Sequence, residues 1–559
     1  MQVRTPARRA ILLLTLLCAL LYLPGLASLP PFDRDEARFA QASKQVLQEG
    51  RWLVPYFQHA PRSKKPAGIY WLQAGSAAGA QAVTTGDGSL RRIWPYRIPS
   101  VLGAWLAVLL TYAVGVQLFE RTAALTGAAL LAGSLLLTVE AHLAKTDAVL
   151  LATILLALWG LARAQARWRA GAALRHCGPW PWLAFWSGLG LSVLIKGPIG
   201  PAVVGLAALG QRWAAGSWRW GCFLAPGRGL ALFVVLAGAW PAALLLTGAG
   251  GFMVESANED LIPKLLSAQE SHGAPPGSYL AALYVAFWPG VLLVVPGLVA
   301  AFRRRTHPGV RFCLAWLVPG WILFALVPTK LPHYVLPFYP ALGLLAGHLV
   351  SAGWPEGRGR VWSVLGALHA GLWVLVGLGL AGAFAVLPAY YGSGVGDAAV
   401  AQTALILAAV AVTAGAAWRT RSLRQPGAAV LAAVLVWPVL AQVYVPRLEQ
   451  LFPARTVARY LPPPEARGAL AATGYTEPSL VFLNGTGTKL TGPAGVAAHL
   501  ARTPDGYGLV AADERERFDA AVAERGAAVR RVLTFPAFNY SKGERVRLTL
   551  FAGRGGAGE

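Results

Sequence analysis

The chain has 559 residues, of which 56% are hydrophobic and only 13% are charged. Soluble proteins carry about a quarter charged residues, so this composition excludes an ordinary soluble enzyme and indicates a polytopic membrane protein. The formal charge of +24 does not indicate a nucleic-acid partner. The cations are spread among short segments between apolar runs, where membrane proteins use them to fix their orientation.

Thirteen apolar runs approach the length of about 17–25 residues that crosses a bilayer as a helix. They cover residues 11–29, 93–118, 122–141, 146–163, 181–196, 198–214, 228–247, 279–301, 311–327, 331–350, 361–384, 402–417 and 428–445. The first run follows three arginines and resembles a signal peptide. We interpret it as an uncleaved helix, because the polar motif directly after it needs an anchor at the membrane surface.

Arginine is concentrated on one side of this predicted topology. With the N-terminus in the cytoplasm, the arginine-rich connections fall on the cytoplasmic side, as the positive-inside rule requires. The short outer loops then hold only lysines, at Lys145, Lys196, Lys264 and Lys330. An odd number of spans puts the C-terminus outside. We therefore expect a multi-pass protein of the plasma membrane (the inner membrane of a bacterium) with a periplasmic or extracytoplasmic C-terminal domain.

The first outer loop, residues 30–92, is rich in polar motifs. These are PPFDRDEARFAQ (31–42) and RSKKPAGIYWLQAG (62–75). Asp35 is predicted to cap a short helix that ends at Gly50, and Pro66 to open a second one. Both helices would lie along the membrane surface, with Tyr70 as an interfacial anchor. Asp33 and its neighbour Arg34 are interpreted as ordinary flanking charge.

Side chains of both charge signs map to this outer rim. They are the carboxylates Asp35, Glu36 and Asp147 and the cations Arg38, Lys65, Lys196 and Lys330. Sugar transfer from a lipid-linked phosphosugar needs both signs. A carboxylate takes the proton of the acceptor hydroxyl, and cations stabilise the charge that develops on the departing phosphate. Helix capping for the carboxylates and snorkelling for the lysines are the alternatives without catalysis.

Long, ordered motifs resemble those of a known family. They are DEARFAQASKQVLQEGRWLVPYF, KKPAGIYWLQA, AKTDAVLLA, LIKGPIGP and TKLPHYVLPFYPALGLLAG. Up to about residue 350 the chain resembles membrane glycosyltransferases of the GT-C fold. The most similar branch contains the lipid A aminoarabinose transferase and is related to the protein O-mannosyltransferases. The resemblance implies about 13 transmembrane helices, outer juxtamembrane helices and a polyprenyl-phosphate sugar donor.

The resemblance also implies roles for single residues. Asp35 matches the catalytic aspartate of the first loop and Asp147 the aspartate of the next outer loop, so both are predicted to be catalytic. Lys65 matches a lysine associated with the lipid phosphate, and Lys330 and Tyr334 match a motif at the donor cavity. The predicted substrate-binding residues are Glu36, Arg38, Lys65, Tyr70, Lys196, Lys330 and Tyr334.

One position departs from the family pattern, because Lys64 stands where relatives have a glutamate that can bind a metal. The sequence therefore predicts no certain cofactor. A divalent metal stays open, with His272 as a candidate ligand or a donor to phosphate.

Residues 1–449 form the predicted GT-C catalytic domain and residues 450–559 a small external α/β domain. Its predicted strands are 479–483, 507–512, 527–535 and 545–553, and its predicted helices are 494–501 and 513–526.

The sequence thus predicts an inverting glycosyltransferase that moves one sugar from a polyprenyl-phosphate donor to lipid A or another glycolipid or cell-envelope acceptor. A polypeptide acceptor, as in protein O-mannosyltransferases, is one alternative. The other is a non-enzymatic transporter of lipid-linked sugars. Transporters place their binding sites near the bilayer midplane, whereas the charges here cluster at one rim, which favours an enzyme.

Overall fold

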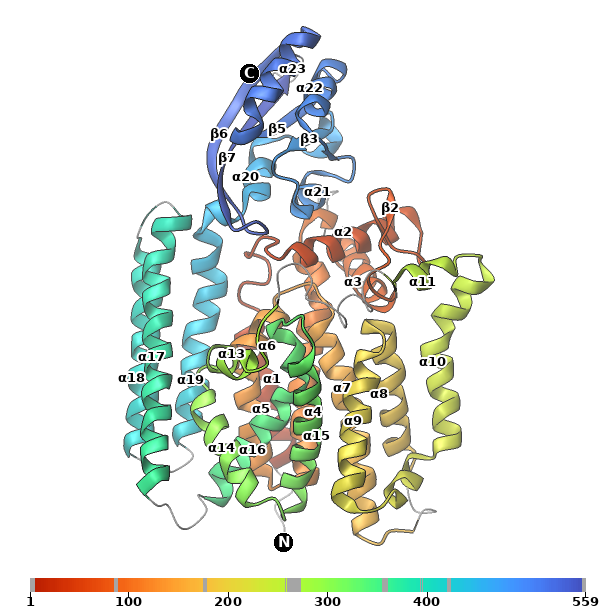
Figure 1. Ribbon diagram of the computed structural model, residues 1–559, viewed down its shortest axis with the longest axis vertical. Helices are drawn as coiled ribbons and strands as arrows, with labels where there is room; N and C mark the ends of the chain where they lie inside the picture. Colours follow the sequence, from red (N-terminus) through yellow and green to blue (C-terminus); the bar gives the residue numbers. More distant parts are fainter. Residues whose placement is uncertain are drawn as a thin grey trace.

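The protein is described by a computed structural model. It describes residues 6–84, 89–173, 178–256, 258, 273–353, 360–392, 394, 396–419 and 424–554. His272 and Lys264 lie outside these described residues. A body of long helices carries a smaller α/β unit at one end, and the N-terminus lies at the opposite end (Figure 1).

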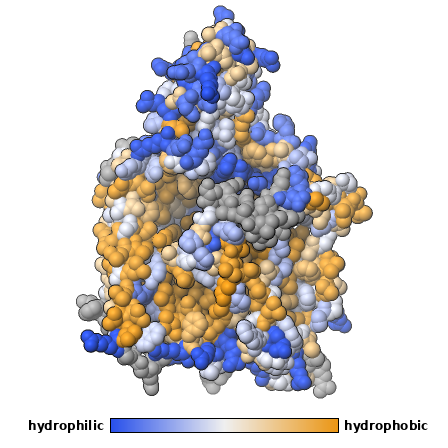
Figure 2. All heavy atoms as spheres, viewed as in Figure 1, coloured by the Kyte–Doolittle hydropathy of each residue, from blue (hydrophilic) through white to orange (hydrophobic). Residues whose placement is uncertain are grey.

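The helical body follows the predicted apolar runs. Its helices are α1 (Pro6–Tyr22), α2 (Arg34–Glu49), α3 (Gly68–Val83), α4 (Trp94–Leu118), α5 (Arg121–Ala132), α6 (Leu135–Ala141), α7 (Asp147–Arg169), α8 (Trp180–Lys196), α9 (Ile199–Ala215), α10 (Pro226–Leu246), α11 (Gly251–Ser256), α13 (Ser278–Ala286), α14 (Val291–Arg303), α15 (Pro308–Leu326), α16 (Tyr339–Ala352), α17 (Arg360–Tyr391), α18 (Asp397–Arg419) and α19 (Arg424–Val439). Figure 2 shows apolar side chains gathered over this body, between more hydrophilic ends. Such an apolar belt is the surface expected to face lipid.

Eight of the described helical segments are long and apolar enough to cross a membrane, and nine if the bent pair α5 and α6 counts as one span. Helices α1, α8 and α9 have 17 residues each. At 1.5 Å per residue they are about 26 Å long, slightly less than the hydrocarbon thickness of about 30 Å. The count of thirteen spans therefore stays a prediction.

Helix α7 is the most buried of these eight segments and packs between α4 and α8. Glycine makes both contacts possible. A Cβ on Gly103 of α4 would lie 2.7 Å from the backbone nitrogen of Val149, and one on Gly188 of α8 would lie 2.6 Å from that of Ala157. Close approach through small residues is typical of membrane helices. It fixes the position of Asp147, the first residue of α7.

Two helices of the first loop cover the end of the body that carries the α/β unit. Helix α2 begins after Asp33, whose side chain accepts hydrogen bonds from the N–H groups of Asp35 and Glu36, and it ends at Gly50 with φ 68°. The prediction that Asp35 caps this helix is therefore wrong by two residues, since Asp33 is the cap. A short hairpin of β1 (Tyr56–Phe57) and β2 (Ala60–Pro61) leads to α3.

The C-terminal unit is a five-stranded sheet in the order β4-β3-β5-β7-β6. Strand β3 is parallel to β4 and β5, whereas β7 is antiparallel to β5 and β6. Its elements are α20 (Pro453–Tyr460), β3 (Leu470–Thr473), α21 (Pro478–Asn484), β4 (Lys489–Leu490), α22 (Pro493–Arg502), β5 (Tyr507–Ala511), α23 (Arg515–Arg525), β6 (Val529–Asn539) and β7 (Glu544–Gly553).

One predicted strand of this unit is wrong. Residues 479–483 form part of α21, with Pro478 at its first turn, a position where proline favours a helix. A short apolar run does not distinguish a buried strand from a buried helix. The residues of this run are buried because α21 packs against α2, which joins the sheet unit to the first loop.

Candidate functional site

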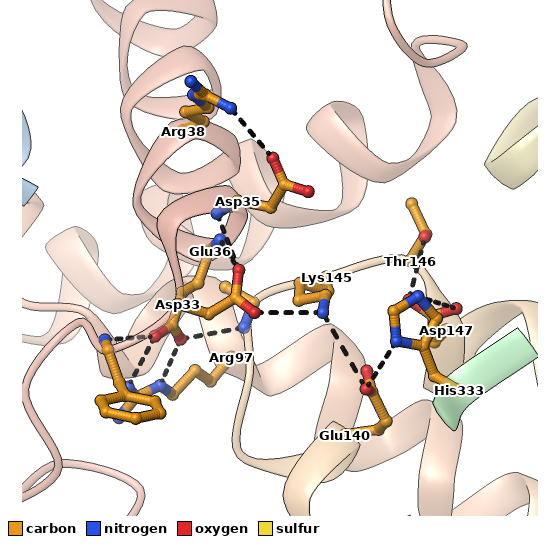
Figure 3. A network of polar contacts seen from close by, with 12 residues as sticks. Asp33, Asp35, Glu36, Arg38, Arg97, Glu140, Lys145, Thr146, Asp147 and His333 are labelled. Atoms are coloured by element: carbon orange, nitrogen blue, oxygen red, sulfur yellow. Dashed lines mark hydrogen bonds and ion pairs between the residues drawn. The ribbon is translucent and has the colours of Figure 1, made fainter. Parts of the chain in front are cut away.

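Asp35 lies in the first turn of α2, and two arginines approach its carboxylate, of which Figure 3 shows Arg38. Its Oδ1 is 3.5 Å from a guanidinium nitrogen of Arg38 and 3.6 Å from one of Arg62. The side chain of Asp35 is 53% exposed, and that of Arg62 only 7%. The structure therefore brings together the predicted residues Asp35 and Arg38 and adds Arg62 to them.

The surroundings of Asp35 favour its charged form. Partial enclosure by the protein would raise the pKa of this carboxyl group, but the charges of Arg62, Arg38, Lys145 and Lys65 outweigh that effect and lower it to about 2. Half of the side chain still faces solvent, which indicates a recess with an open side. Asp35 is therefore a carboxylate throughout the physiological pH range.

Glu36 forms a buried ion pair with Arg97 of α4. The guanidinium donates to both carboxylate oxygens, at 2.7 and 3.0 Å, and also to the carbonyl groups of Leu26, Leu29 and Pro30. Glu36 further accepts from the N–H of Ala144 at 3.0 Å. Its side chain has no accessible surface. The predicted substrate contact of Glu36 does not fit this burial, and its observed place is a junction between the first loop, α4 and the loop before α7.

A chain of polar contacts connects the start of α2 with Asp147 (Figure 3). Lys145 lies 3.3 Å from Asp33 and 3.9 Å from Glu140 of α6. Glu140 lies 3.7 Å from His333, and His333 lies 4.0 Å from Asp147. Although burial alone would lower the pKa of Lys145, its four carboxylate neighbours raise it. The lysine is therefore charged, and it links the cap of α2, Asp33, to Glu140 of α6.

Lys196, the last residue of α8, closes this chain. Its ammonium group donates a hydrogen bond of 2.6 Å to Asp147 and lies 5.8 Å from the centre of the Tyr334 ring. Asp147 is buried. The predicted residues Asp147, Lys196 and Tyr334 are thus brought together, although they are far apart along the sequence.

Glu140, Asp147 and His333 offer ligand atoms that all lie within 4.8 Å of one another. These are donor types that bind transition metals, and Oε2 of Glu140 has no hydrogen-bond partner among the described residues. The ammonium groups of Lys145 and Lys196, however, already balance the two carboxylates. We therefore derive no step that requires a metal here, and the predicted candidate His272 lies outside the described residues.

A cavity of about 310 Å³ opens beside Asp147. Its polar lining comes from Lys64, Lys65, Asp147, Lys196, His333 and Tyr334. Its apolar lining comes from the spans, with Leu150 of α7, Val193 and Leu194 of α8, Ala237, Trp240 and Pro241 of α10 and Phe324 of α15. The cavity therefore combines a cationic part with a part suited to a hydrocarbon chain.

Two residues predicted to bind substrate, Tyr70 and Lys330, are not among the residues that line this cavity. Tyr70 is fully buried, and its hydroxyl accepts a 3.0 Å hydrogen bond from Arg62. It holds the side chain of Arg62 in place, and the predicted contact of Tyr70 with substrate stays a prediction. Lys330 donates a 2.6 Å hydrogen bond to the carbonyl of Val327, which itself lines the cavity.

Sequence reasoning did not assign Arg62, Arg97 or Glu140 to the site. Arg62 stands in the same motif as Lys65, and this was the one available signal for it. Glu140 falls inside a predicted apolar span, and Arg97 pairs with a residue 61 positions away. No sequence pattern indicates such a partner.

Comparisons with known proteins agree with this architecture. The family described as dolichyl-phosphate-mannose-protein mannosyltransferase matches residues 64–244, under half of the chain. An undecaprenyl phosphate-alpha-4-amino-4-deoxy-L-arabinose arabinosyl transferase of Erwinia tasmaniensis is 28% identical over 352 residues, which are 61% of this chain and 59% of the relative. One from Pseudomonas fluorescens is 28% identical over 379 residues, 66% of this chain and 65% of the relative. The match thus spans less than two thirds of these relatives.

Solved structures match over nearly the whole chain. ArnT from Cupriavidus metallidurans bound to undecaprenyl phosphate has a TM-score of 0.69 at 17% identity, covering 97% of this chain and 98% of that one. Its apo structure has a TM-score of 0.70 and covers 99% of both chains. The protein therefore has the fold of the GT-C membrane glycosyltransferases. Within that class, the chain resembles the aminoarabinose transferases in sequence and in fold.

Proposed function

We propose that the protein is an inverting glycosyltransferase that moves one sugar from a polyprenyl-phosphate carrier to an acceptor at the outer membrane surface. The observation that carries this proposal is the cavity in which Lys65 and Lys196 adjoin apolar side chains of four helices, α7, α8, α10 and α15. A lipid phosphate sits at the interface with its hydrocarbon tail in the bilayer, so this cavity suits both of its parts. The names of the relatives support an undecaprenyl-phosphate sugar as the donor.

The lysines stabilise the leaving group. As the bond between the sugar C1 and the phosphate oxygen breaks, negative charge grows on the lipid phosphate, and ammonium groups of Lys65 and Lys196 beside it lower the barrier. Lys330 at the cavity margin is proposed to assist, and Tyr334 to orient the donor. Asp147 holds Lys196 in place through their 2.6 Å hydrogen bond.

Asp35 is proposed as the general base. The acceptor hydroxyl attacks C1 from the face opposite the phosphate, which inverts the configuration, and its proton passes to the carboxylate of Asp35. A carboxyl group with a pKa of about 2 is a weak base. Engagement of Arg38 by a bound phosphate would release Asp35 from one of its cations and raise its basicity when the substrate is present.

We propose lipid A or another cell-envelope glycolipid as the acceptor, because the chain is similar to aminoarabinose transferases over more than 350 residues. A polypeptide acceptor is the second candidate, supported by the mannosyltransferase family that matches residues 64–244. In the proposed orientation the N-terminus is cytoplasmic, and the first loop and the sheet unit face the periplasm.

The test is transfer by the purified protein from an undecaprenyl-phosphate sugar to lipid A, followed by mass spectrometry. Asp35→Asn should abolish transfer, and Lys65→Ala should lose donor binding or turnover while the protein still folds. Lys542→Ala removes an equivalent charge from the exposed tip between β6 and β7 and should leave transfer unchanged. Full activity of Asp35→Asn or Lys65→Ala would show that the changed residue does not have the proposed role. Donor binding by the wild-type protein without any transfer would favour the alternative of a non-enzymatic transporter.

Glycolipids and glycoproteins of a deletion strain identify the sugar and the acceptor together. A single missing sugar on a lipid supports the proposed acceptor. The same loss on polypeptides supports the alternative, and unchanged glycolipids and glycoproteins contradict both.

A further inference from the structure

Two neighbouring cavities with basic walls lie between the helical body and the sheet unit. One has a volume of about 400 Å³ and includes Pro30, Pro31, Arg91, Arg92, Trp94 and Arg455 in its lining. The other has about 480 Å³ and includes Gln442, Arg447, Glu449, Arg455 and Arg459. Because Arg455 lines both, the two cavities adjoin each other. We call the pair of cavities the arginine groove, defined by Arg91, Arg92, Arg447, Arg455 and Arg459.

The arginine groove lies where three segments leave the helical body. Pro30 and Pro31 follow the connection after α1, Trp94 begins α4, and Arg447 lies in the irregular turns that follow α19. Helix α20 carries the chain from there to the sheet unit (Figure 1). If these helices span the membrane, their ends lie at the level of the lipid headgroups.

The groove is strongly unbalanced in charge. Arg91 is neutralised by Glu465, at 2.5 Å, and Arg459 lies 3.2 Å from Glu449 in an exposed pair, which contributes little stability. No described carboxylate lies within ion-pair distance of Arg92, Arg447 or Arg455. Arg92 and Arg447 are exposed and Arg455 is half-buried. Glu449 lines the same cavity as Arg447 and Arg455, so the five arginines of the groove face two carboxylates, Glu449 and Glu465, and the groove keeps a net positive charge.

Two of the arginines also repel each other. Arg455 and Arg459 are one helical turn apart on α20 and face the same cavity, and like charges at this spacing are unfavourable. Burial and then the charge of Arg459 lower the pKa of Arg455, and the nearby charge of Glu449 offsets this only in part. The positive-inside rule does not require these arginines, because in the proposed orientation they lie outside. A bound anion would relieve the repulsion.

We propose that the arginine groove binds a phosphate group of a phosphorylated glycolipid acceptor. Guanidinium groups bind phosphate with two parallel hydrogen bonds, and the groove lies at the depth of lipid headgroups. This inference rests on the proposed function and names the acceptor class for it. The acceptor carries at least two polar groups, one held in the groove and one presented to Asp35.

The spacing agrees with such an acceptor. Pro31, in the wall of the groove, is four residues before Asp35, and an extended chain of four residues spans at most about 14 Å. One headgroup with two phosphorylated sugars bridges a distance of this order. An acceptor held in this way approaches Asp35 from the side of the groove, whereas the donor cavity lies beside Asp147 and Lys196.

The test measures lipid binding to the full-length protein in detergent by native mass spectrometry. The probes are bisphosphorylated lipid A, monophosphorylated lipid A and phosphatidylglycerol. The double variant Arg455→Gln/Arg459→Gln should raise the Kd for bisphosphorylated lipid A at least tenfold. The double variant Arg92→Gln/Arg447→Gln should have the same effect and replaces the first one if that variant misfolds. Arg502→Gln/Arg517→Gln removes two exposed charges from the sheet unit and should change it less than twofold.

A transfer assay supplies the second readout. The groove variants should raise the KM for bisphosphorylated lipid A at least tenfold and leave kcat and the donor KM within twofold. An unchanged Kd, or an equal loss of phosphatidylglycerol binding, would overturn the inference. Normal transfer to a polypeptide without lipid A binding would overturn the proposed phosphate site and leave the proposed glycosyl transfer intact. Lipid A binding that depends on the arginines, without any transfer, would overturn only the proposed function.

Discussion

Arg97 and Glu36 form a two-point ion pair whose side chains are only 1% and 0% exposed. Arg97 belongs to α4 in the helical body, and Glu36 belongs to the first turn of α2, directly after Asp35. The pair therefore fixes the proposed base relative to the membrane helices. An isolated buried charge is very costly, whereas a paired and hydrogen-bonded charge is tolerated.

Glu36→Gln should destabilise the protein by about 3–5 kcal/mol, because it leaves Arg97 buried without a counter-charge. Activity should fall as well, since α2 loses its link to α4. The measurement is the midpoint of denaturant unfolding together with the transfer rate. Glu524→Gln, which removes an exposed partner of Arg525, should shift stability by less than about 0.5 kcal/mol. A wild-type stability for Glu36→Gln would contradict the anchoring role.

The Asp35–Arg62 contact should contribute stability that depends on pH. The folded-state pKa of Asp35 is lowered from 3.8 to about 2, so the contribution is complete above pH 3.8 and is lost as the pH falls through 2. Arg62→Gln removes the cation with the largest effect. The difference in Tm between wild type and Arg62→Gln should be constant near neutral pH and shrink below pH 4.

Arg51→Gln is the matched control for this measurement, because Arg51 is 55% exposed and pairs with Glu49 instead. Its Tm difference from wild type should stay small across the same range. A difference for Arg62→Gln that is independent of pH would mean that Arg62 acts only through its contacts with the Phe39 ring and the Tyr70 hydroxyl.

Hydrophobic length predicted the long helices of the body, but it did not predict where they bend. Residues 122–141 read as one apolar run, yet α5 and α6 meet at an angle of 62°. The break falls at Gly133 and Ser134, in a place where the indole of Trp437 donates to the Gly133 carbonyl. This bend involves a partner 304 residues away in the sequence, so the local sequence pattern does not predict it.

The candidate site shows the same limit. Charge on the proposed outer rim predicted Asp35, Asp147, Lys65 and Lys196 as candidates, because charge at membrane depth is expensive and therefore conspicuous. The pairing of those charges was not predictable. In the sequence, Glu140 is an isolated charge inside an apolar run. In the folded protein it lies between Lys145 and His333.

Chelation should leave transfer activity unchanged, because Lys145 and Lys196 supply the positive charge that a divalent ion would otherwise bring to Glu140 and Asp147. Lys196→Met removes one of these charges and leaves the metal-type donors of Glu140, Asp147 and His333. This variant should bind Zn²⁺ more tightly than wild type does, as measured by elemental analysis after dialysis. Loss of wild-type activity on chelation, restored by a divalent ion, would contradict this prediction and identify a metal enzyme.

Lys44 on α2 should make docking of the sheet unit sensitive to pH. It is buried, its ammonium group lies 3.2 Å from the carbonyl of Phe482 in α21, and burial together with the charge of Arg91 lowers its pKa from 10.5 to about 7. Between pH 7 and 10.5 the unfolded chain holds this proton and the folded protein does not. Stability from this group therefore rises with pH across that window.

Lys44→Met keeps most of the volume and removes the titration. The Tm of wild type should rise relative to that of the variant between pH 6 and pH 9, because only wild type is relieved of a buried ammonium charge. Lys489→Met, which changes an exposed lysine of the same sheet unit, should follow wild type at both pH values. If the Tm difference between wild type and Lys44→Met is the same at pH 6 and pH 9, the lysine stays protonated in the folded protein. Its hydrogen bond to the Phe482 carbonyl and its contact with the Phe482 ring, at 5.2 Å, then outweigh the cost of burying its charge.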